Sequence, residues 1–391
     1  MHSPTEPSAR QHVVEHAKSL AAKFAARADA AEQARTISKE SMQDMLDSGF
    51  TRILMPQRFG GYDLDFEAWL DVILELGRAD ASHAWCASLV IHHAHLLAQY
   101  PEEMQRAIWA NGPDVAIAAS FAPRAKVTPV EGGYRVSCDQ STFASGVNHS
   151  SWAMVGGMLH GSGPPKWLLL MVPPGQFSVR DVWNTAGMRG TGSNTIVTDS
   201  VFVPTAHAVD LAELREGKAP GGALSSNPTT RTPFFFYAPL CFAAPMLGAA
   251  LGAYAHFREW TKPRKAVDGS SVAEKVSVQV RMARVAADLD AAEMLLRRAS
   301  RTPASLEEIT PQLLARSIRD FSRVSEITVA AMDALMELSG TAGFGASNPI
   351  QRAWRDVRFA ATHISLNPEN NYANFGRIEF GLPRDPTRPF F

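Results

Sequence analysis

The sequence contains little cysteine. Its three cysteines, Cys86, Cys138 and Cys241, are spread through 391 residues with no Cys-x-x-Cys pair. An odd and scattered set of this kind argues against a disulfide framework and against a cysteine-based zinc site. We therefore expect the protein to work in a reducing compartment, the cytoplasm.

The sequence also has no excess of charge of either sign. It carries 38 Lys and Arg against 39 Asp and Glu, for a net charge of −1. Nucleic acids and anionic membranes attract proteins through a basic excess. We expect neither to be the main partner. The first residues, 1–7, show no basic and then apolar signal pattern.

One apolar run is long enough to be mistaken for a membrane span. Phe234–Tyr254 approaches membrane-spanning length. It contains Pro239 and Pro245 and is rich in alanine, and glycines such as Gly248 and Gly252 suit close helix packing. A buried core helix is the favoured interpretation, and a membrane span is the alternative.

The hydrophobic period changes twice along the chain. Apolar residues at spacings of three and four predict helices over 12–30, 41–49, 66–76 and 82–99. Short β-rich segments between Gly and Pro turns predict strands over 115–119, 126–129, 134–138, 152–158, 167–172, 177–182 and 195–203. Helical patterns return over 234–260, 271–300, 311–340 and 350–363. The predicted domains are a helical domain over 1–112, a β domain over 113–212, a mobile loop over 213–233, and a helical bundle with a tail over 234–391.

A glycine-rich turn precedes the last predicted strand. The segment Gly187–Asn194 reads Gly-Met-Arg-Gly-Thr-Gly-Ser-Asn. A dinucleotide fingerprint would join a strand to a helix, whereas these glycines lead into a strand. We therefore expect the chain to have no NAD(P)H site of its own. A purely structural hairpin is the alternative to a role in cofactor binding.

Three segments together resemble the acyl-CoA dehydrogenase superfamily. They are Thr142–Gly146, Gly187–Pro204 and Gly343–Asp356. The resemblance covers nearly the whole chain. It implies an α+β fold with an N-terminal helical domain, a central antiparallel β-barrel and a C-terminal four-helix bundle, assembled as a homotetramer.

The third segment departs from the dehydrogenases at the position of their base. Gly343–Asp356 keeps the Pro, Arg, Arg and Asp of their motif, but the Glu that removes the α-proton of the thioester is replaced by Ser347. A hydroxyl without an activating partner cannot remove a carbon-bound proton at neutral pH. The sequence thus predicts a flavin scaffold without dehydrogenation chemistry.

The first segment indicates a different flavin chemistry. Phe143-Ala144-Ser145-Gly146 resembles the oxygenase components of two-component flavin monooxygenases, which act on p-hydroxyphenylacetate, steroid rings, indole and dibenzothiophene. The resemblance implies reduced FMN or FAD, delivered by a separate NAD(P)H:flavin reductase, and O2 as co-substrate. Ser145 would accept the flavin N5–H and prolong the life of a C4a-hydroperoxide. A turn serine that bonds its own backbone is the alternative.

Histidines supply the candidate substrate and proton groups. His92 and His95 share a helical face, while His93 points about 100° away. A metal site would need a third ligand, and no carboxylate stands at helical spacing nearby. The resemblance favours substrate binding by His92 and His95, with ordinary core or surface histidines as the alternative. It implies that His363 faces flavin and substrate and handles protons, unless it merely ends a helix.

Further candidates are weaker. The resemblance suggests cofactor contacts from Ser120, Phe143, Arg189, Gly190, Thr191 and Arg264, with FMN versus FAD left open. Phe235 and Tyr237 could line an aromatic substrate pocket, although aromatic residues at such spacing are often plain core.

The sequence favours a reduced-flavin-dependent monooxygenase that oxygenates an aromatic or phenolic small molecule, catalytically through His363, Ser145 and His92. Oxygen transfer to nitrogen or sulfur of a heteroaromatic molecule stays open. The first alternative is an acyl-CoA dehydrogenase or oxidase with a relocated base. The second is a catalytically silent flavin-fold protein that acts as a binding or assembly module.

Overall fold

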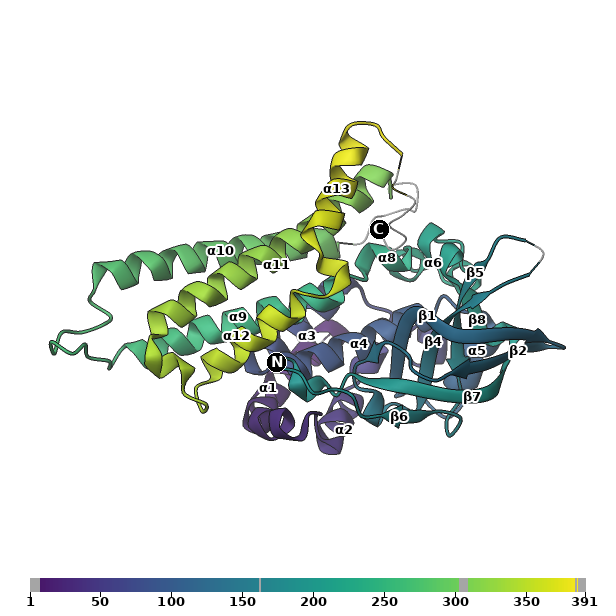
Figure 1. Ribbon diagram of the computed structural model, residues 1–391, viewed down its shortest axis with the longest axis horizontal. Helices are drawn as coiled ribbons and strands as arrows, with labels where there is room; N and C mark the ends of the chain where they lie inside the picture. Colours follow the sequence, from purple (N-terminus) through teal and green to yellow (C-terminus); the bar gives the residue numbers. More distant parts are fainter. Residues whose placement is uncertain (1–7, 162, 302–308, 384, 386–391) are drawn as a thin grey trace, which may run out of the picture.

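The computed structural model describes residues 8–161, 163–301, 309–383 and 385; the segment 1–7 lies outside them. An N-terminal helical part, a central sheet and a C-terminal set of long helices follow one another along the chain (Figure 1). The N-terminal helices are α1 (Ala9–Ala34), α2 (Lys39–Asp47), α3 (Phe66–Ala79), α4 (Ala81–Leu97) and α5 (Glu102–Ile108).

Side-chain caps fix where the first four helices begin. The N-cap residues Ser8, Ser38, Asp65 and Asp80 each accept a backbone N–H of the first turn, and such caps satisfy donors that have no partner within the helix. The sequence placed these helices correctly because their apolar spacing continues up to the caps. Helix α4 is buried on nearly every side, so its four histidines, His83, His92, His93 and His95, lie in the interior.

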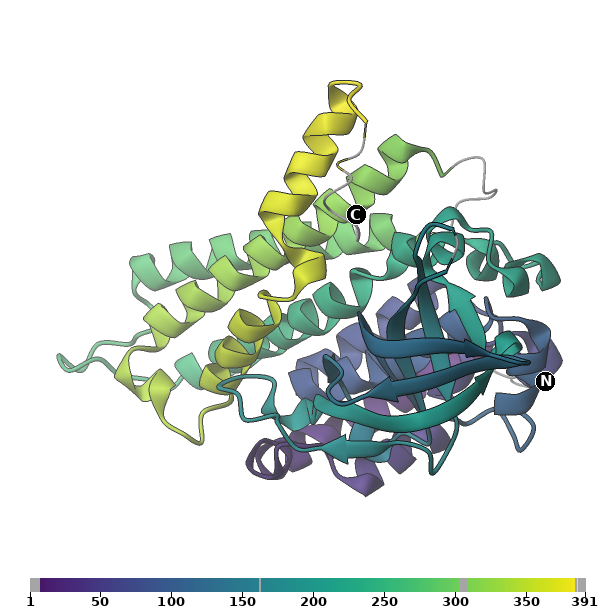
Figure 2. The same ribbon diagram turned by 45° about the vertical axis from the view of Figure 1, so that its right-hand side comes forward.

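The central domain is a mixed sheet of eight strands. They are β1 (Ile117–Val130), β2 (Gly133–Cys138), β3 (Phe143–Ala144), β4 (Trp152–Leu159), β5 (Lys166–Val172), β6 (Ser178–Arg180), β7 (Asn194–Pro204) and β8 (Ala208–Asp210). Their order is β3-β7-β2-β1-β4-β5-β8, with β6 paired to β7. Figure 2 shows the sheet with helices packed against its inner side.

The prediction of an antiparallel barrel was wrong in two respects. Strands β1 and β4 run parallel, with Ile117 opposite Trp152, and the sheet stays open. The reason is the crossover between β2 and β4: the segment that holds β3 and the turn Val147–His149 carries the chain back across the sheet. Two predicted strands, 115–119 and 126–129, are one strand, β1, with irregular register around Pro123, which has no N–H to donate.

The segment that we predicted to be a mobile loop, 213–233, has regular structure. It overlaps α6 (Leu211–Glu216) and contains a 3₁₀ turn (Pro220–Leu224) and α7 (Pro228–Arg231). Several of its residues are buried, among them Thr229 and Thr232. Its mobility remains a hypothesis.

The C-terminal part consists of α8 (Phe234–Tyr237), α9 (Leu240–Thr261), α10 (Val276–Ser300), α11 (Pro311–Ser339), α12 (Pro349–Ala360) and α13 (Pro368–Glu379). Helices α9 to α12 pack against one another, and α9 also packs closely on α3 and α4. The long helices therefore share one core with the N-terminal domain.

The apolar run at α8 and α9 is a core segment. Phe234–Thr261 is long and apolar enough to cross a membrane, but 83% of its most apolar window is buried inside the protein. Glycines allow the close helix crossing that buries it. A Cβ on Gly252 would lie 2.1 Å from the carbonyl oxygen of Arg78, and one on Gly248 would lie 2.8 Å from the Cα of Gly77.

Candidate active site

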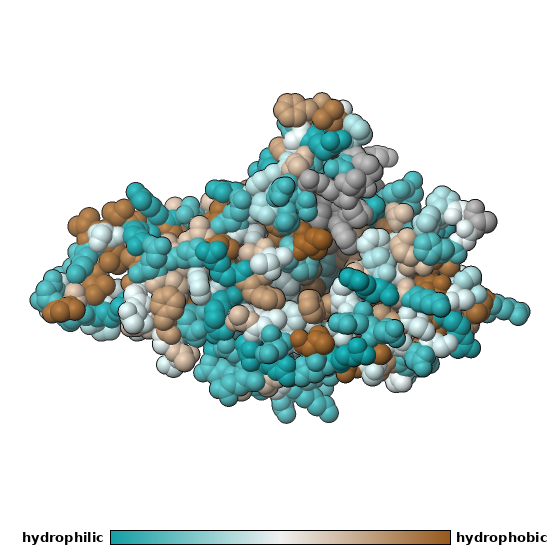
Figure 3. Space-filling view, in the orientation of Figure 1, coloured by the Kyte–Doolittle hydropathy of each residue, from teal (hydrophilic) through white to brown (hydrophobic). Residues whose placement is uncertain are grey.

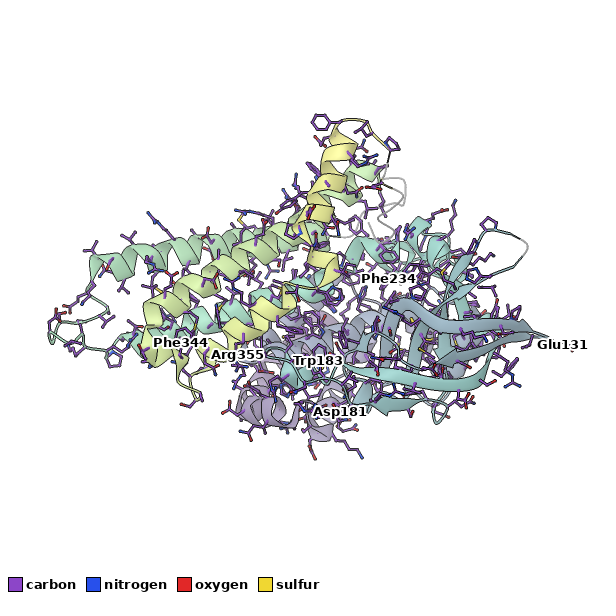
Figure 4. The ribbon with its side chains drawn as sticks, viewed as in Figure 1. Glu131, Asp181, Trp183, Phe234, Phe344 and Arg355 are labelled. Atoms are coloured by element: carbon purple, nitrogen blue, oxygen red, sulfur yellow. The ribbon has the colours of Figure 1, made fainter. Side chains whose placement is uncertain are left out.

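A cavity of about 470 Å³ lies where the helices meet the sheet. Its walls come from α4, β1, the segments around β3 and before β7, the region of α8 and α9, and the end of α12. Figure 4 shows Trp183 and Phe234, two of its aromatic lining residues, between the sheet and the helices. Most of the lining is apolar, and none of the lining residues carries a carboxylate, ammonium or guanidinium group.

Ser145 heads a chain of hydrogen bonds at the cavity wall. The indole Nε1 of Trp85 donates to its Oγ over 3.0 Å, and its Oγ lies 2.7 Å from the Oγ of Ser193. Ser193 in turn lies 2.7 Å from the Oγ1 of Thr191, which donates to the carbonyl oxygen of Met188 over 2.8 Å. Sequence reasoning proposed Ser145 and Thr191 but missed Trp85 and Ser193. The position of Ser193 within the glycine-rich segment Gly187–Asn194 was the one available signal.

Residues of α12 hold the turn that carries Thr191 and Ser193. A Cβ on Gly187 would lie 2.3 Å from the carbonyl oxygen of Arg355, so no larger residue fits there. The backbone N–H of Met188, in the left-handed region at φ 53°, donates to Oδ1 of Asp356 over 2.6 Å. Burial, with the nearby Asp80, raises the pKa of Asp356 to about 7. The Arg and Asp kept from the dehydrogenase motif thus anchor this turn.

His92 lies at the cavity with one nitrogen unpaired. Its Nδ1 contacts the thiol of Cys241, and its buried Nε2 has no hydrogen-bond partner among the described residues. Burial raises the pKa of the Cys241 thiol well above its ordinary value, so the thiol keeps its hydrogen. A thiol is both a weak donor and a weak acceptor. Burial also lowers the pKa of His92, so the ring is neutral, and when the thiol donates to Nδ1 the ring hydrogen lies on Nε2.

His93 is the histidine that the sequence analysis did not select. Its Nδ1 donates to the carbonyl oxygen of Ile117 over 2.6 Å, because a carbonyl can only accept. Burial lowers the pKa of His93 to about 4. The ring is therefore neutral, Nε2 carries no hydrogen, and this cavity-lining residue is a hydrogen-bond acceptor. Helical spacing separated His93 from His92 but could not show that the cavity reaches both.

His363 also lines the cavity, just after α12. Its ring stacks on Phe242 at a centroid distance of 3.6 Å, and its Nδ1 accepts the backbone N–H of Ser365 over 3.2 Å. Burial lowers the pKa of His363 to about 4. The neutral ring therefore bears its hydrogen on Nε2 and is a donor. This tautomer does not suit the role of a base, one of the two proton roles that the resemblance implied for His363.

Two predicted substrate residues lie outside the cavity lining. His95 is turned away, with its Nε2 donating to the carbonyl oxygen of Thr229 over 2.9 Å. Tyr237 is fully buried and stacks on Phe66 at 3.8 Å. Both side chains pack in the core behind the cavity wall, because α4 and α8 present their other faces to the cavity. Phe235 does line it.

Some of the predicted cofactor residues line the cavity, and others do not. Phe143 and Thr191 line the cavity. Ser120 does not line the cavity. Its hydroxyl lies 2.6 Å from the hydroxyl of Thr142, which does. Gly190 and Arg189 act within the turn. A Cβ on Gly190 would lie 2.9 Å from that of Ser82, while the Arg189 guanidinium donates to the carbonyl oxygens of residues 32 and 185.

Arg264 cannot reach this cavity within one chain. It follows the far end of α9, whereas Phe242, near the start of that helix, lines the cavity. Twenty-two residues of helix span roughly 30 Å. The Arg264 guanidinium instead stacks on Trp260 and donates to the carbonyl oxygen of Ser339. A cofactor role for Arg264 would require a second copy of the chain.

The position of the dehydrogenase base lies outside the cavity. Ser347 is exposed in the turn before α12 and is not part of the lining. No Asp or Glu among the described residues lines the cavity in its place. The described residues also hold no cluster of three His, Cys, Asp or Glu side chains that could bind a metal.

The cavity fits a flavin ring by the chemistry of its walls. Aromatic side chains, including Phe143, Trp183 and Phe359, offer apolar contact surface to a flat ring. Within this mostly apolar lining, the hydroxyl of Ser145 can accept a ring N–H when it donates its own hydrogen to Ser193. Mostly apolar sites with a few placed polar groups are typical of cofactor sites.

Comparison with known proteins gives the family of the chain. The N-terminal domain model of acyl-CoA dehydrogenase matches residues 5–112, and the C-terminal domain model matches 240–368. The chain is 33% identical to the flavin-dependent monooxygenase oxygenase subunit HsaA of Rhodococcus jostii, over 92% of this chain and 96% of the relative. It is 33% identical to the oxygenase component of an FADH2-dependent resorcinol hydroxylase of a Rhizobium species, over 97% of both chains. Among solved structures, XiaF from a Streptomyces species in complex with FADH2 and glycerol superimposes with a TM-score of 0.89 at 26% identity, over 96% of both chains.

The fold and the cavity define a flavoprotein of the acyl-CoA dehydrogenase type. The chain belongs to the acyl-CoA dehydrogenase superfamily and, within it, to the oxygenase components of two-component flavin-dependent monooxygenases.

Proposed function

We propose that this chain uses reduced flavin and O2 to transfer one oxygen atom to an aromatic small molecule, with a phenol as the favoured substrate. The observation that carries the proposal is the lining of the cavity, which holds the Ser145 hydroxyl and three uncharged imidazoles, those of His92, His93 and His363, and no charged side chain. A dehydrogenase with a relocated base is not supported, because this cavity offers no carboxylate.

The residues suggest a division of tasks. The bound flavin would supply the electrons that activate O2 for transfer of one oxygen atom. Ser145 holds a ring N–H, and the aromatic walls exclude water. The Nε2–H of His92 and the bare Nε2 of His93 can together satisfy a hydroxyl group, which both accepts and donates. The Nε2–H of His363 can donate to an oxygen atom in the cavity.

The imidazole tautomers support a phenol over an ether or a carbonyl compound. A phenolic hydroxyl offers a hydrogen to His93 and lone pairs to His92. An ether or a carbonyl oxygen has no hydrogen to offer, and it would leave the acceptor nitrogen of His93 unpaired, which costs free energy in a dry site.

The proposal is tested by supplying the purified chain with a flavin reductase, NADH, flavin and a panel of phenols under ¹⁸O2. We expect a hydroxylated product that carries one ¹⁸O atom, with the second atom appearing in water. Bleaching of oxidised flavin by CoA thioesters without O2 would instead identify a dehydrogenase. Failure to bind flavin at all would favour a silent scaffold. Parallel titrations with FMN and FAD decide which flavin is used.

We also propose that the chain acts in the cytoplasm as a homotetramer, receives flavin from a separate NAD(P)H:flavin reductase, and uses α9–α12 as a four-helix bundle. Exposed apolar side chains support assembly: Met294 on α10 is 72% exposed and Phe380 after α13 is 83% exposed. Figure 3 shows hydrophobic residues gathered at the outer end of α13 and over the start of α10. Light scattering on the eluted protein would give the mass, and a monomer would contradict the proposal.

A further inference from the structure

The hydrogen-bond chain behind Ser145 has a preferred direction. Three hydroxyls, those of Ser145, Ser193 and Thr191, each own one hydrogen. Three donor–acceptor orders place one hydrogen in each contact between them. In the inward order, Ser145 donates to Ser193, Ser193 to Thr191, and Thr191 to the carbonyl oxygen of Met188. In the outward order, every hydrogen is reversed and Ser145 donates into the cavity. In the third order, Ser145 and Thr191 both donate to Ser193, which gives up the bond from Thr191 to Met188 and leaves Ser145 oriented as in the inward order.

The protein favours the inward order. It satisfies the 2.8 Å bond from Thr191 to Met188, which the outward order gives up. Thr191 and Ser193 are 1% and 3% exposed, so water cannot compensate for the loss. The Trp85 indole can only donate and occupies one lone pair of Ser145 in either order. In the inward order, Ser145 therefore presents to the cavity a lone pair and no hydrogen.

We propose that Thr191 and Ser193 are positioning residues that make Ser145 a hydrogen-bond acceptor, and that this makes the cavity select reduced over oxidised flavin. The inference rests on the proposed function. Reduction places hydrogen on ring nitrogens that are bare acceptors in the oxidised ring. An acceptor hydroxyl in the cavity accepts a hydrogen bond from the reduced ring. Next to the oxidised ring, the same hydroxyl would place its lone pair against the lone pair of a ring nitrogen, which is repulsive. Such selection suits an enzyme that must capture reduced flavin from a reductase.

The test is equilibrium binding of reduced and oxidised flavin to the full-length protein under anaerobic conditions. We expect wild type to bind reduced flavin more tightly. Thr191→Val removes the inner acceptor, so Ser193 can turn its hydrogen outward and Ser145 can donate to the cavity. The carbonyl oxygen of Met188 still accepts Nε1 of Trp183 over 2.9 Å. We expect the ratio of the two dissociation constants to fall by roughly tenfold, the worth of about one hydrogen bond. Ser193→Ala should act in the same direction.

Two further variants separate the hydroxyl chain from general damage. Thr191→Ser keeps the hydroxyl and should keep the wild-type ratio. Thr198→Val removes another buried threonine hydroxyl, bonded to the carbonyl oxygen of Val136 in the sheet, and should also leave the ratio unchanged. An unchanged ratio in both Thr191→Val and Ser193→Ala, with flavin still bound, would overturn the inference. Failure of wild type to bind either flavin would instead overturn the proposed function.

Discussion

The thiol of Cys241 lies against Nδ1 of His92, and the Nε2 of the same ring is buried at the cavity without a partner among the described residues. An unpaired buried donor is costly in the free protein, so this nitrogen is suited to meet a ligand. The ring itself is held by stacking on Phe234 at a centroid distance of 4.7 Å. A group held in orientation in this way can recognise substrate.

We expect His92→Phe to weaken binding of the phenolic substrate by roughly tenfold, because one hydrogen bond in a dry site is lost. The aromatic ring keeps the stack with Phe234. Calorimetric titration with substrate measures the effect, and titration with reduced flavin serves as the internal control. Equal losses for substrate and flavin would assign His92 a structural role.

Ser145→Ala should separate flavin binding from productive use of O2. Without the acceptor hydroxyl, a larger share of the consumed O2 should leave as hydrogen peroxide, by several-fold, while reduced flavin still binds through the aromatic walls. Peroxide and product are quantified in the same reaction. Wild-type coupling in this variant would remove Ser145 from its proposed task.

His363→Phe should lower the amount of product formed per O2. The substituted ring keeps the stack with Phe242 but has no N–H to donate to oxygen. We expect a several-fold loss of coupling, with little change in the midpoint of thermal unfolding. If stability falls and coupling is retained, His363 is a packing residue.

Asp356→Asn should change how stability depends on pH. Because the pKa of Asp356 is raised to about 7 in the folded protein, the folded state binds more protons than the unfolded state between about pH 4 and pH 7. Raising the pH through this interval therefore removes up to roughly 2–4 kcal/mol from the free energy of unfolding. The asparagine can still accept the N–H of Met188 but does not titrate. Urea unfolding at pH 5 and pH 8 should show a smaller pH effect in the variant, and identical slopes would contradict the raised pKa.

Gly252→Ala should destabilise the crossing of α3 and α9. The added methyl would lie 2.1 Å from the carbonyl oxygen of Arg78, and overpacking of this kind typically costs about 1–3 kcal/mol. The matched control is Gly376→Ala in α13, where an added Cβ meets nothing within 4 Å. Chemical unfolding should show a loss for the first variant and none for the second.

The sequence determined most of the fold because its signals are local. Apolar spacing and capping residues such as Ser38 and Asp65 define the helices, and β-rich segments between turns define most strands. The mixed sheet was not predictable in this way. Whether β4 runs parallel or antiparallel to β1 depends on the path of the crossover between them, which no local pattern records.

The same distinction between local and long-range signals applies to the candidate site. The resemblance carried by the sequence proposed Ser145, His92 and His363 as site residues and put Ser347 at the position of the dehydrogenase base, and the first three line the cavity. Only the tertiary structure brought His93 to the cavity, turned His95 away, and placed Trp85 and Ser193 around the hydroxyl of Ser145. The physical reason is that hydrogen-bond partners and tautomers are set by atoms far apart in the sequence. The Ile117 carbonyl that fixes His93 and the Cys241 thiol that fixes His92 meet those rings only when the helices pack on the sheet.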